Sequence, residues 1–254
     1  AAGGTVNQAV QGVIFNIQDI VKRCSYAYET VKLMEYPPYL QKGTRKVEDL
    51  KNPHEIEFRN VSFSYPNTGV QVLKNVSIKI KAGERLSVVG LNGAGKTTLV
   101  RTLATLSRAT SGTALVAGFD AKEEPDKVRE HIGLISHNPM LYPDLTAMEN
   151  LMFTAQLYGV VNAEERVREL LRAVELDHRR FDVVRTFSRG MTQRLSIARA
   201  LMNDPDVVFL DEPYAGLDPH AVEIFDGLIE QLRDGRTFIM VSHDLQKGFD
   251  VCTH

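Results

Sequence analysis

The feature that most limits how this chain can fold is the run Gly90-Leu91-Asn92-Gly93-Ala94-Gly95-Lys96-Thr97-Thr98. It follows the apolar segment Leu86–Val89 and opens a segment suited to a helix, which is the setting that the pattern G-x-x-x-x-G-K-[ST] requires. Glycines let backbone N–H groups turn inward and bind phosphate oxygens, where a side chain would block the approach. The run therefore predicts a loop that binds the phosphates of a nucleotide.

Lys96 and Thr97 supply the polar side chains of this loop. We expect the Lys96 ammonium group to reach the β- and γ-phosphates and the Thr97 hydroxyl to bind Mg²⁺. A dinucleotide-binding fingerprint, the main alternative, needs G-x-G-x-x-G and an acid about twenty residues after its first glycine. Thr98 and Thr110 stand at those two places, so the sequence excludes that alternative. The loop residues predicted to bind nucleotide are Gly90, Asn92, Gly93, Gly95, Lys96, Thr97 and Thr98.

The apolar patterning predicts an α/β fold with two kinds of sheet. Four runs are apolar without alternation, which is typical of parallel strands covered by helices on both faces. Three earlier runs alternate apolar and polar residues, which indicates a small antiparallel sheet. The first set is Leu86–Val89, Ile132–Ile135, Val207–Leu210 and Phe238–Val241, and the second is Ile56–Phe58, Val61–Tyr65 and Val76–Ile80.

The region from about residue 140 to 203 is predicted to be mainly helical. Glu164–Leu176 is amphipathic, and Ser188–Met202 follows as a second helical segment. We therefore expect a helical subdomain inserted into a mainly parallel P-loop core, beside a small antiparallel β subdomain.

Two acids follow the apolar run Val207–Leu210. Asp211, at a strand end beside the phosphate loop, is predicted to hold Mg²⁺ directly or through water. Glu212 is predicted to be the general base that polarises the attacking water. Taken alone, an apolar strand followed by Asp-Glu is more often a strand end whose acids are simply exposed to solvent. The presence of the phosphate loop makes the metal-binding and catalytic interpretation the better one. His243, after Phe238–Val241, is a site candidate because ligands bind at the carboxyl edge of parallel sheets.

From Glu55 onwards, the order of these motifs resembles the nucleotide-binding domain of ATP-binding-cassette (ABC) transporters. Tyr65 matches the aromatic residue that stacks on adenine, and His243 matches the histidine that contacts the γ-phosphate. Phe187-Ser188-Arg189-Gly190-Met191 occupies the position of the signature loop, and Ala215-Gly216-Leu217-Asp218 matches the loop that crosses between two such domains.

The resemblance implies that two domains pair head to tail. Ser188 and Gly190 of one chain would then contact the ATP held by Lys96 of the other, and Asp218 is expected among the nucleotide-binding residues. A serine hydroxyl and a glycine N–H at a helix N-terminus are also suited to bind an anion.

The chain departs from the family pattern at two places. Arg189 and Met191 replace a glycine and the glutamine of the usual Leu-Ser-Gly-Gly-Gln, and His137 stands where the coupling loop usually has glutamine. Histidine can still hydrogen-bond water or a metal ligand, so we keep His137 as an expected metal contact. Both departures resemble the ATP-binding subunits of bacterial haem exporters.

Residues 1–40 follow a different pattern. Nine apolar positions between residues 6 and 34 are spaced alternately by four and three, which predicts a long helix with a narrow apolar seam. Pro37 and Pro38 end it. A helix that binds a partner helix is favoured over one that packs on its own domain, because core helices have wider apolar faces. The segment resembles the junction of fused exporters, where the last membrane helix runs into the ATPase domain.

The predicted domain organisation has three parts. We interpret residues 1–40 as a stalk-like helix, 41–53 as a linker and 54–254 as the ATPase domain. The family normally continues with further strand and helix after His243, so we expect the chain to be a fragment, either truncated or a composite of two subfamilies.

Composition limits the functions that the chain can have. Its 254 residues include 30 Lys and Arg against 32 Asp and Glu, a formal net charge of −2 that gives no sign of a nucleic-acid partner. No run approaches the ~18–20 apolar residues of a membrane span. Cys24 and Cys252 lie far apart, which fits a reducing compartment.

These observations predict an ATPase that uses ATP and Mg²⁺ to power transport, and export in particular, through a partner transmembrane domain at the cytoplasmic face of the membrane. One alternative is a soluble ABC-type ATPase that acts on ribosomes or chromosomes, and the single cassette argues against it. Another is a regulatory nucleotide-binding module, and the intact Lys96, Asp211, Glu212 and His243 argue against it. An ATPase domain does not encode the transported substrate.

Overall fold

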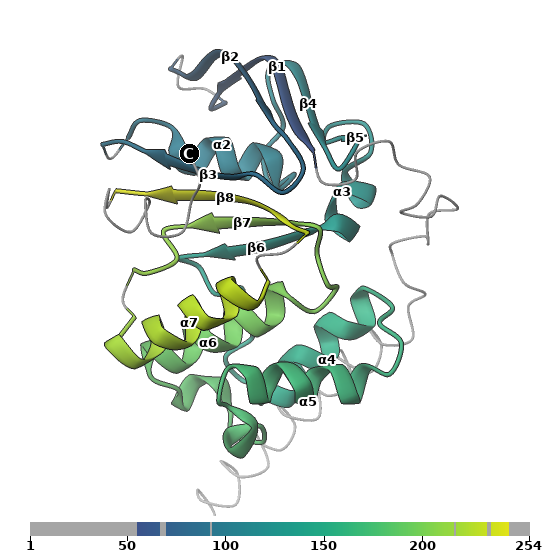
Figure 1. The fold of residues 1–254 in the computed structure, drawn as a ribbon, viewed down its shortest axis with the longest axis vertical. Coiled ribbons are helices and arrows are strands. Elements are labelled where there is room, and N and C mark those ends of the chain that lie inside the picture. Colours follow the sequence, from purple (N-terminus) through teal and green to yellow (C-terminus); the bar gives the residue numbers. More distant parts are fainter. Residues whose placement is uncertain (1–54, 67–69, 92, 216, 233–234, 244–254) are drawn as a thin grey trace, which may run out of the picture. The chain divides into compact units, whose positions relative to one another are not determined.

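An antiparallel sheet forms one part of the structure (Figure 1). A computed structural model describes residues 55–66, 70–91, 93–215, 217–232 and 235–243. The strand order is β2-β1-β4-β5, and every neighbouring pair is antiparallel. The four strands are β1 (Ile56–Ser64), β2 (Gln71–Ile80), β4 (Ser111–Val116) and β5 (Phe119–Asp120).

The predicted antiparallel runs differ from the observed strands in extent. The two runs between residues 56 and 65 form one strand, β1, whose pairing register shifts after Phe58 around Asn60, which has a φ of 52°. The sequence analysis did not identify β4, because its first residues are polar and glycine-rich. Gly112 is required there, since an added Cβ would lie 2.4 Å from the Asn60 carbonyl oxygen.

A parallel sheet forms the second part, with the strand order β3-β8-β7-β6. Its strands are β3 (Arg85–Val89), β6 (Ile132–Ser136), β7 (Val207–Asp211) and β8 (Thr237–Ser242). Strands β6, β7 and β8 are buried almost throughout, as the apolar runs predicted. The prediction is wrong for β3, whose residues are all only half-buried. Strands β3 and β6 both lie at an end of the strand order, but β6 is also covered by the helices Pro125–His131 and Arg189–Ala200, against which it packs.

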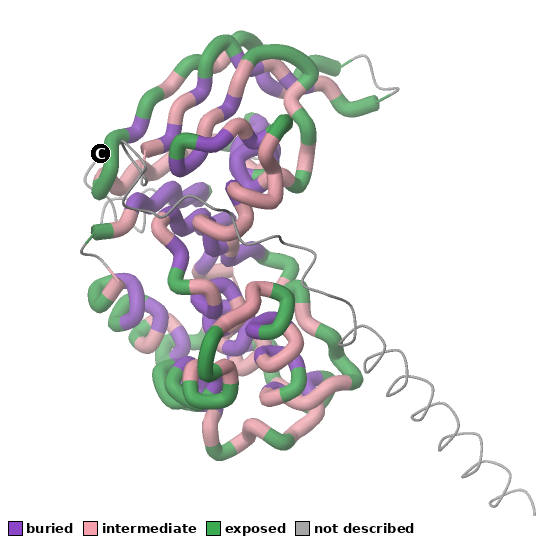
Figure 2. The backbone as a smooth tube through the Cα atoms, turned by 90° about the vertical axis from the view of Figure 1, so that its right-hand side faces the viewer, coloured by how far each residue is buried: buried purple, intermediate pink, exposed green. Residues whose placement is uncertain are grey.

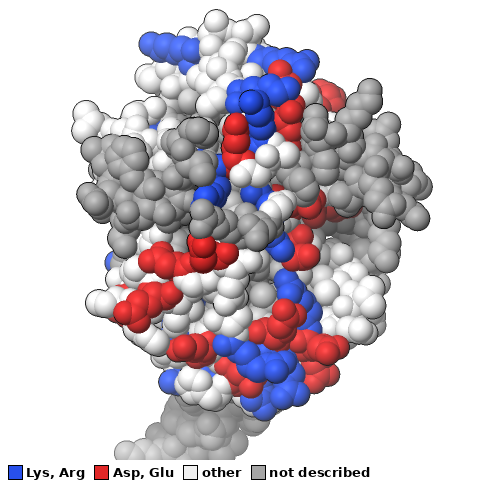
Figure 3. Space-filling model, viewed as in Figure 1, with Lys and Arg blue, Asp and Glu red and all other residues white. Residues whose placement is uncertain are grey.

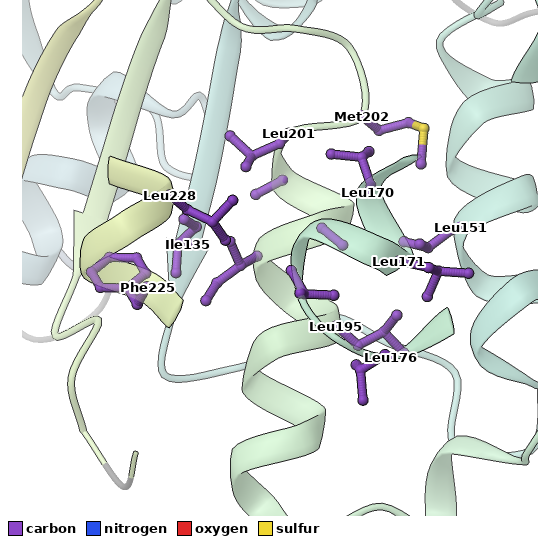
Figure 4. Close-up of a cluster of buried hydrophobic side chains, with 14 of the residues drawn as sticks. Ile135, Leu151, Leu170, Leu171, Leu176, Leu195, Leu201, Met202, Phe225 and Leu228 are labelled. Atoms are coloured by element: carbon purple, nitrogen blue, oxygen red, sulfur yellow. The ribbon is translucent and has the colours of Figure 1, made fainter. Parts of the chain in front are cut away.

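Each face of the parallel sheet belongs to a different apolar cluster. Figure 2 shows that buried residues are concentrated in the interior of the domain. On one face, the sheet packs against helices that lie between residues 147 and 231. Figure 4 shows Ile135 of β6 in this cluster with Leu195, Leu171 and Phe225. On the other face, Val207 and the alternate residues of β7 and β8 share a cluster with β1, β2, β4 and the helix α2 (Lys96–Leu103). The sheet is thus covered on both faces, as expected for an α/β core.

The helices are α2 (Lys96–Leu103), α3 (Pro125–His131), α4 (Ala147–Leu157), α5 (Ala163–Ala173), α6 (Arg189–Ala200) and α7 (Pro219–Gln231), with 3-10 turns at Asp177–Arg179 and Val184–Thr186. Helices α4 and α5 pack together and on α6, which in turn contacts β6 and α7. A capping box between Thr146 and Glu149 starts α4 by satisfying two backbone N–H groups. The helical region predicted between residues 140 and 203 is therefore present.

The surface gives two further observations. Within the described ranges, no helix combines the length and apolar character needed to cross a membrane. On the face seen in Figure 3, acidic and basic side chains are interspersed. The predicted N-terminal helix and linker lie outside the described residues.

Candidate functional site

The glycine-rich loop leads from β3 into α2, as its pattern predicted. Gly95 precedes the helix with a φ of 86°, and an added Cβ would lie 3.1 Å from Val72 Cγ1, so both its conformation and its surroundings favour glycine. Lys96 is buried, and its Nζ donates hydrogen bonds to the carbonyl oxygens of Gly90 at 2.6 Å and Leu91 at 3.1 Å. The ammonium group is thus held along the loop itself, and Asn92 lies outside the described residues.

Thr97 and Asp211 meet although 114 positions separate them in the chain. The Thr97 hydroxyl at the start of α2 donates to Asp211 Oδ1, at the carboxyl end of β7, over 3.0 Å. Asp211 is 2% exposed, and this burial raises its pKa above the ordinary value, while the Thr97 hydrogen bond acts in the opposite direction. The parallel sheet therefore brings a hydroxyl and a carboxyl oxygen together beside the loop.

These two oxygens fit a magnesium ion. Mg²⁺ prefers oxygen ligands and is usually held by one or two protein groups together with substrate phosphates and water. Among the residues that the structure describes, no group of three or more His, Cys, Asp or Glu side chains gathers as a closed metal site. The donor set of Thr97 and Asp211 is thus suited to an ion that shares its coordination with a nucleotide.

Glu212 and His243 form a pair at the ends of neighbouring strands. His243 Nδ1 lies 2.7 Å from Glu212 Oε2, and the His243 side chain is 66% exposed whereas that of Glu212 is 21% exposed. Glu212 has a φ of 53°, in the left-handed region that costs a non-glycine residue about 1–3 kcal/mol. Its backbone N–H donates to the Val241 carbonyl oxygen at 2.9 Å, so β8 fixes this strained residue.

His137 lies at the same edge of the sheet, just beyond β6. Its Nδ1 is 3.8 Å from Asp211 Oδ2, and its side chain is mostly exposed. The residue that replaces the expected glutamine therefore does face the buried acid. It can exchange water or ligands there because its other side is open to solvent.

Tyr65 lies next to the phosphate loop rather than far from it. Its hydroxyl is 3.2 Å from Thr98 Oγ1 on α2, and its ring packs edge-to-face on Phe63 with centroids 5.0 Å apart. The side chain remains exposed, so a flat ligand can reach the ring. The geometry places an aromatic surface beside the first turn of the helix that carries Lys96 and Thr97.

The signature-loop residues occupy the start of α6. Ser188 caps the helix by accepting a hydrogen bond from the Met191 N–H at 3.2 Å. Gly190 packs against Asp218, because a Cβ at position 190 would lie 2.8 Å from Asp218 Oδ2. Asp218 caps α7 in turn by accepting from the Ala221 N–H at 2.8 Å. Among the described residues, the hydrogen bonds of Lys96 go to its own loop and that of Ser188 goes to its own helix.

The structure thus divides the predicted residues into two groups. Loop, acids and histidines gather at the carboxyl edge of the parallel sheet, while Ser188, Gly190 and Asp218 gather at the starts of α6 and α7. The sequence analysis missed Tyr214, whose hydroxyl donates to Asp226 Oδ1 at 2.7 Å. Only its position between Glu212 and Asp218 could have pointed to it.

Comparisons with known proteins agree on one family. The family model described as "ABC transporter" matches residues 73–215. The chain is 38% identical over 184 residues to the uncharacterized ABC transporter ATP-binding protein YdbJ of Bacillus subtilis, which covers 72% of this chain and 59% of that protein. It is 42% identical over 199 residues to the macrolide export ATP-binding/permease protein MacB of Salmonella choleraesuis, covering 74% of this chain and 31% of that protein. The chain therefore spans well under two thirds of both relatives.

A further relative and two solved structures extend this result. The Nod factor export ATP-binding protein I of Cupriavidus metallidurans is 35% identical over 202 residues, covering 78% of this chain and 66% of that protein. The ATP-binding subunit of an ABC transporter superposes with a TM-score of 0.70 at 32% identity, covering 78% of this chain and 82% of that chain. The dimeric post-hydrolysis cassette MJ0796, bound to ADP and Pi, gives 0.69 at 29% identity, covering 76% and 90%. The chain belongs to the ABC transporter family, as an ATP-binding domain.

Proposed function

We propose that this domain hydrolyses ATP and that hydrolysis powers transport by a partner membrane domain. The observation that carries the proposal is the meeting of Lys96, the Thr97–Asp211 pair and the Glu212–His243 pair at one edge of the sheet. A cation, a magnesium-binding pair and a carboxylate suited to accept a proton are the groups that phosphoryl transfer to water requires.

Each group has one role in this proposal. Lys96 leaves the loop carbonyls and binds the β- and γ-phosphate oxygens, while Gly90, Gly93, Gly95 and Thr98 line the phosphates. Thr97 and Asp211, with His137 nearby, would hold Mg²⁺, which would supply positive charge against the phosphates. The adenine stacks on Tyr65, whose hydroxyl already lies beside α2.

The chemical step uses Glu212 and His243. Glu212 takes a proton from the water whose oxygen bonds to the γ-phosphorus, as the bond from that phosphorus to the β,γ-bridging oxygen breaks and ADP leaves. His243, which reaches Glu212 at 2.7 Å, holds the carboxylate in place and contacts the γ-phosphate. The strained backbone of Glu212 supports this role, because strain of that kind persists where function requires it.

The remaining site residues act across a dimer. Ser188 and Gly190 lie at the start of α6, and their contacts within the described residues are to Met191 and Asp218, which supports a role in the site of a second cassette. Asp218 supports Gly190 from α7. Two related solved structures of the MJ0796 cassette are dimeric, one of them in a post-hydrolysis state bound to ADP and Pi.

Complementation between two inactive variants tests the dimer. Ser188→Arg blocks the helix start, and Lys96→Ala removes the phosphate contact, so each variant alone should lose phosphate release. A mixed dimer holds one site with both defects and one intact site, so mixing should restore part of the rate. Absence of recovery at every mixing ratio would reject the arrangement across the dimer.

The relatives support export as the process that is powered. MacB is described as an export ATP-binding/permease protein and the Cupriavidus relative as a Nod factor export ATP-binding protein. The domain would then work at the cytoplasmic face of a membrane, bound to a transmembrane partner. Reconstitution with the membrane protein encoded beside it should couple ATP hydrolysis to substrate movement, and unchanged ATPase rates with and without that protein would reject the coupling.

A narrower assignment rests on His137 and Arg189 alone. Both residues depart from the usual family pattern in the way that haem-exporter subunits do, so haem is the first molecule to test as the transported substrate. The same departures would also suit another exported molecule, and a haem-binding measurement on the reconstituted transporter separates the two.

The organisation of the chain is part of the proposal. The seam in residues 1–40 supports a stalk that binds a partner helix, followed by a linker at 41–53 and the ATPase domain from 54 onwards, interrupted by the helical subdomain. Ile17→Lys with Ile20→Lys should abolish association through the seam and leave ATP affinity unchanged. Hydrogen-exchange protection of residues 8–34 in the monomer would instead indicate packing on the ATPase domain.

A further inference from the structure

Tyr214 lies two residues after Glu212, in the segment between β7 and α7, and two contacts fix its side chain. The hydroxyl donates to Asp226 Oδ1 on α7 at 2.7 Å. The ring packs edge-to-face on Phe225, with centroids 5.1 Å apart and an interplanar angle of 90°. Phe225 is fully buried in the apolar cluster of the helices, so the Tyr214 ring rests on a rigid support.

The backbone of the same segment is tied to Glu212 by short-range hydrogen bonds. The Ala215 N–H donates to the Glu212 carbonyl oxygen at 3.1 Å, and the Leu217 N–H donates to the Tyr214 carbonyl oxygen at 3.2 Å. Two tight turns therefore follow the strained residue, and Tyr214 belongs to both. These hydrogen bonds connect the backbone at Tyr214 to the backbone at Glu212 within three residues.

A carboxylate on a left-handed backbone needs surroundings that hold it there. On one side of Glu212, β8 supplies the Val241 carbonyl oxygen for its N–H. On the other side, the first side chain that anchors the segment to a helix is Tyr214. An O–H···O⁻ hydrogen bond is charge-assisted and directional, so it fixes the tyrosine more closely than the ring contact alone would.

We propose that the Tyr214–Asp226 hydrogen bond is a latch that positions the Glu212 carboxylate towards the attacking water. Tyr214 touches neither water nor phosphate in this inference, so it is a positioning residue and not a catalytic one. The inference rests on the proposed ATP hydrolysis. Its expected signature is a lower kcat with an unchanged KM for ATP, because Lys96 and Thr97 bind nucleotide from a different segment.

The test removes only the hydroxyl. Tyr214→Phe keeps the ring on Phe225 and should lower kcat about tenfold, within the loss that a misplacement of about 1 Å causes. Asp226→Ala should give the same loss, and the double variant should be no slower than either single variant because both remove one interaction. Asp226→Asn keeps an oxygen that accepts from the tyrosine, so it should recover most of the rate.

The matched control is Tyr142→Phe. Tyr142 also packs edge-to-face on a phenylalanine, Phe153, with centroids 5.3 Å apart and an angle of 86°, but it belongs to the segment between β6 and α4 and not to the one that carries Glu212. This variant removes a tyrosine hydroxyl from an equivalent ring pair and should leave kcat unchanged. Melting temperatures of all variants are measured alongside.

The outcomes separate the two proposals. If the parent chain releases no phosphate, or if Glu212→Gln hydrolyses ATP as fast as the parent, the proposed function fails. If the parent hydrolyses ATP through Glu212 but Tyr214→Phe stays within twofold of Tyr142→Phe, only the latch fails. The latch is also overturned if kcat falls only in variants whose melting temperature falls too, and Asp226→Asn does not recover kcat.

Discussion

The two ends of the parallel sheet carry the same kind of side-chain pair in different surroundings. At the carboxyl end, His243 Nδ1 lies 2.7 Å from Glu212 Oε2, and the His243 side chain is 66% exposed. At the amino end, His131 Nδ1 lies 2.6 Å from Asp206 Oδ2, and the His131 side chain is only 14% exposed. The chemistry of the pairs is alike, so their surroundings decide what each can do.

The amino end is closed by further contacts. The His131 ring stacks on Phe119 of β5 at 5.5 Å, which links the antiparallel sheet to the start of β6. Asn203 donates its amide to the carbonyl oxygens of Glu130 and Ile132. At the carboxyl end, the side chain of His243 is mostly exposed to solvent instead. An acid–histidine pair therefore stabilises the fold at one end and remains available to a ligand at the other.

The largest expected effect comes from replacing the acid at the carboxyl end. Glu212→Gln keeps the shape and the hydrogen bond to His243 but cannot accept a proton. Loss of a general base lowers the rate about 10²–10⁴-fold, while ATP affinity and the melting temperature should not change. Steady-state phosphate release and nucleotide binding, measured on one preparation, check this. A variant that keeps more than about a third of the parent rate would place the base elsewhere.

A smaller effect is expected at the phosphate loop. Lys96→Ala removes the charged hydrogen bonds to phosphate, each of which contributes about 1.5–3 kcal/mol, so the Kd for ATP should rise about 10–100-fold. Lys127→Ala is the control from the opposite end, because Lys127 pairs with Glu124 at 2.6 Å on α3. Equal Kd values for the two variants would contradict the assignment of the nucleotide to the carboxyl end.

Much of the fold could be predicted from the sequence because apolar patterning reflects burial directly. Three of the four unbroken apolar runs, such as Val207–Leu210, are strands buried almost throughout. Strand β4 could not be predicted in this way, since Gly112 is there for a close backbone approach and not for its hydropathy. The half-burial of β3 depends on which helices cover an end strand of the sheet, and no local pattern contains that information.

The sequence predicted which residues belong to the candidate site, but not the contacts between them. The glycine-rich loop and the acids at the end of β7 are local motifs, and each implied a neighbour without specifying the contact. The Thr97–Asp211 hydrogen bond and the left-handed φ of Glu212 arise only when strands far apart in the chain become adjacent. For the same reason, the role of Tyr214 could not be inferred from its position alone.

At the amino end, the same carboxyl-to-amide change should affect stability instead of rate. Asp206→Asn removes the charge that pairs with His131, and a partly buried pair of this kind contributes about 1 kcal/mol, which corresponds to about 2–4 °C in melting temperature. ATP hydrolysis should match that of the parent. Asp206→Asn should therefore lower the melting temperature and leave ATP hydrolysis unchanged, whereas Glu212→Gln should do the reverse. If both variants change the same quantity, the two ends of the sheet do not differ in the way argued above.

The smallest expected effect is a change in stability, and it concerns the buried carboxyl group of Asp211 at the carboxyl end of the sheet. Burial raises the pKa of this carboxyl, so its protonated form is the one that the fold tolerates best. A carboxyl whose folded pKa lies above its unfolded pKa contributes its full stability only below the unfolded value, and this contribution is lost as the pH rises through the folded value. At neutral pH the buried charge therefore destabilises the nucleotide-free chain.

Asp211→Asn should remove that penalty. The amide is neutral at every pH and still accepts the Thr97 hydrogen bond, so the variant should melt at a higher temperature than the parent at pH 7 without nucleotide. The difference should shrink as the pH falls and Asp211 of the parent becomes protonated. Melting curves in metal-free buffers across this range measure it, with Glu212→Gln as the neighbouring control. A variant that is less stable than the parent at pH 7 would show that Thr97 stabilises the carboxylate more than burial disfavours it, because only then does the charged form favour the fold.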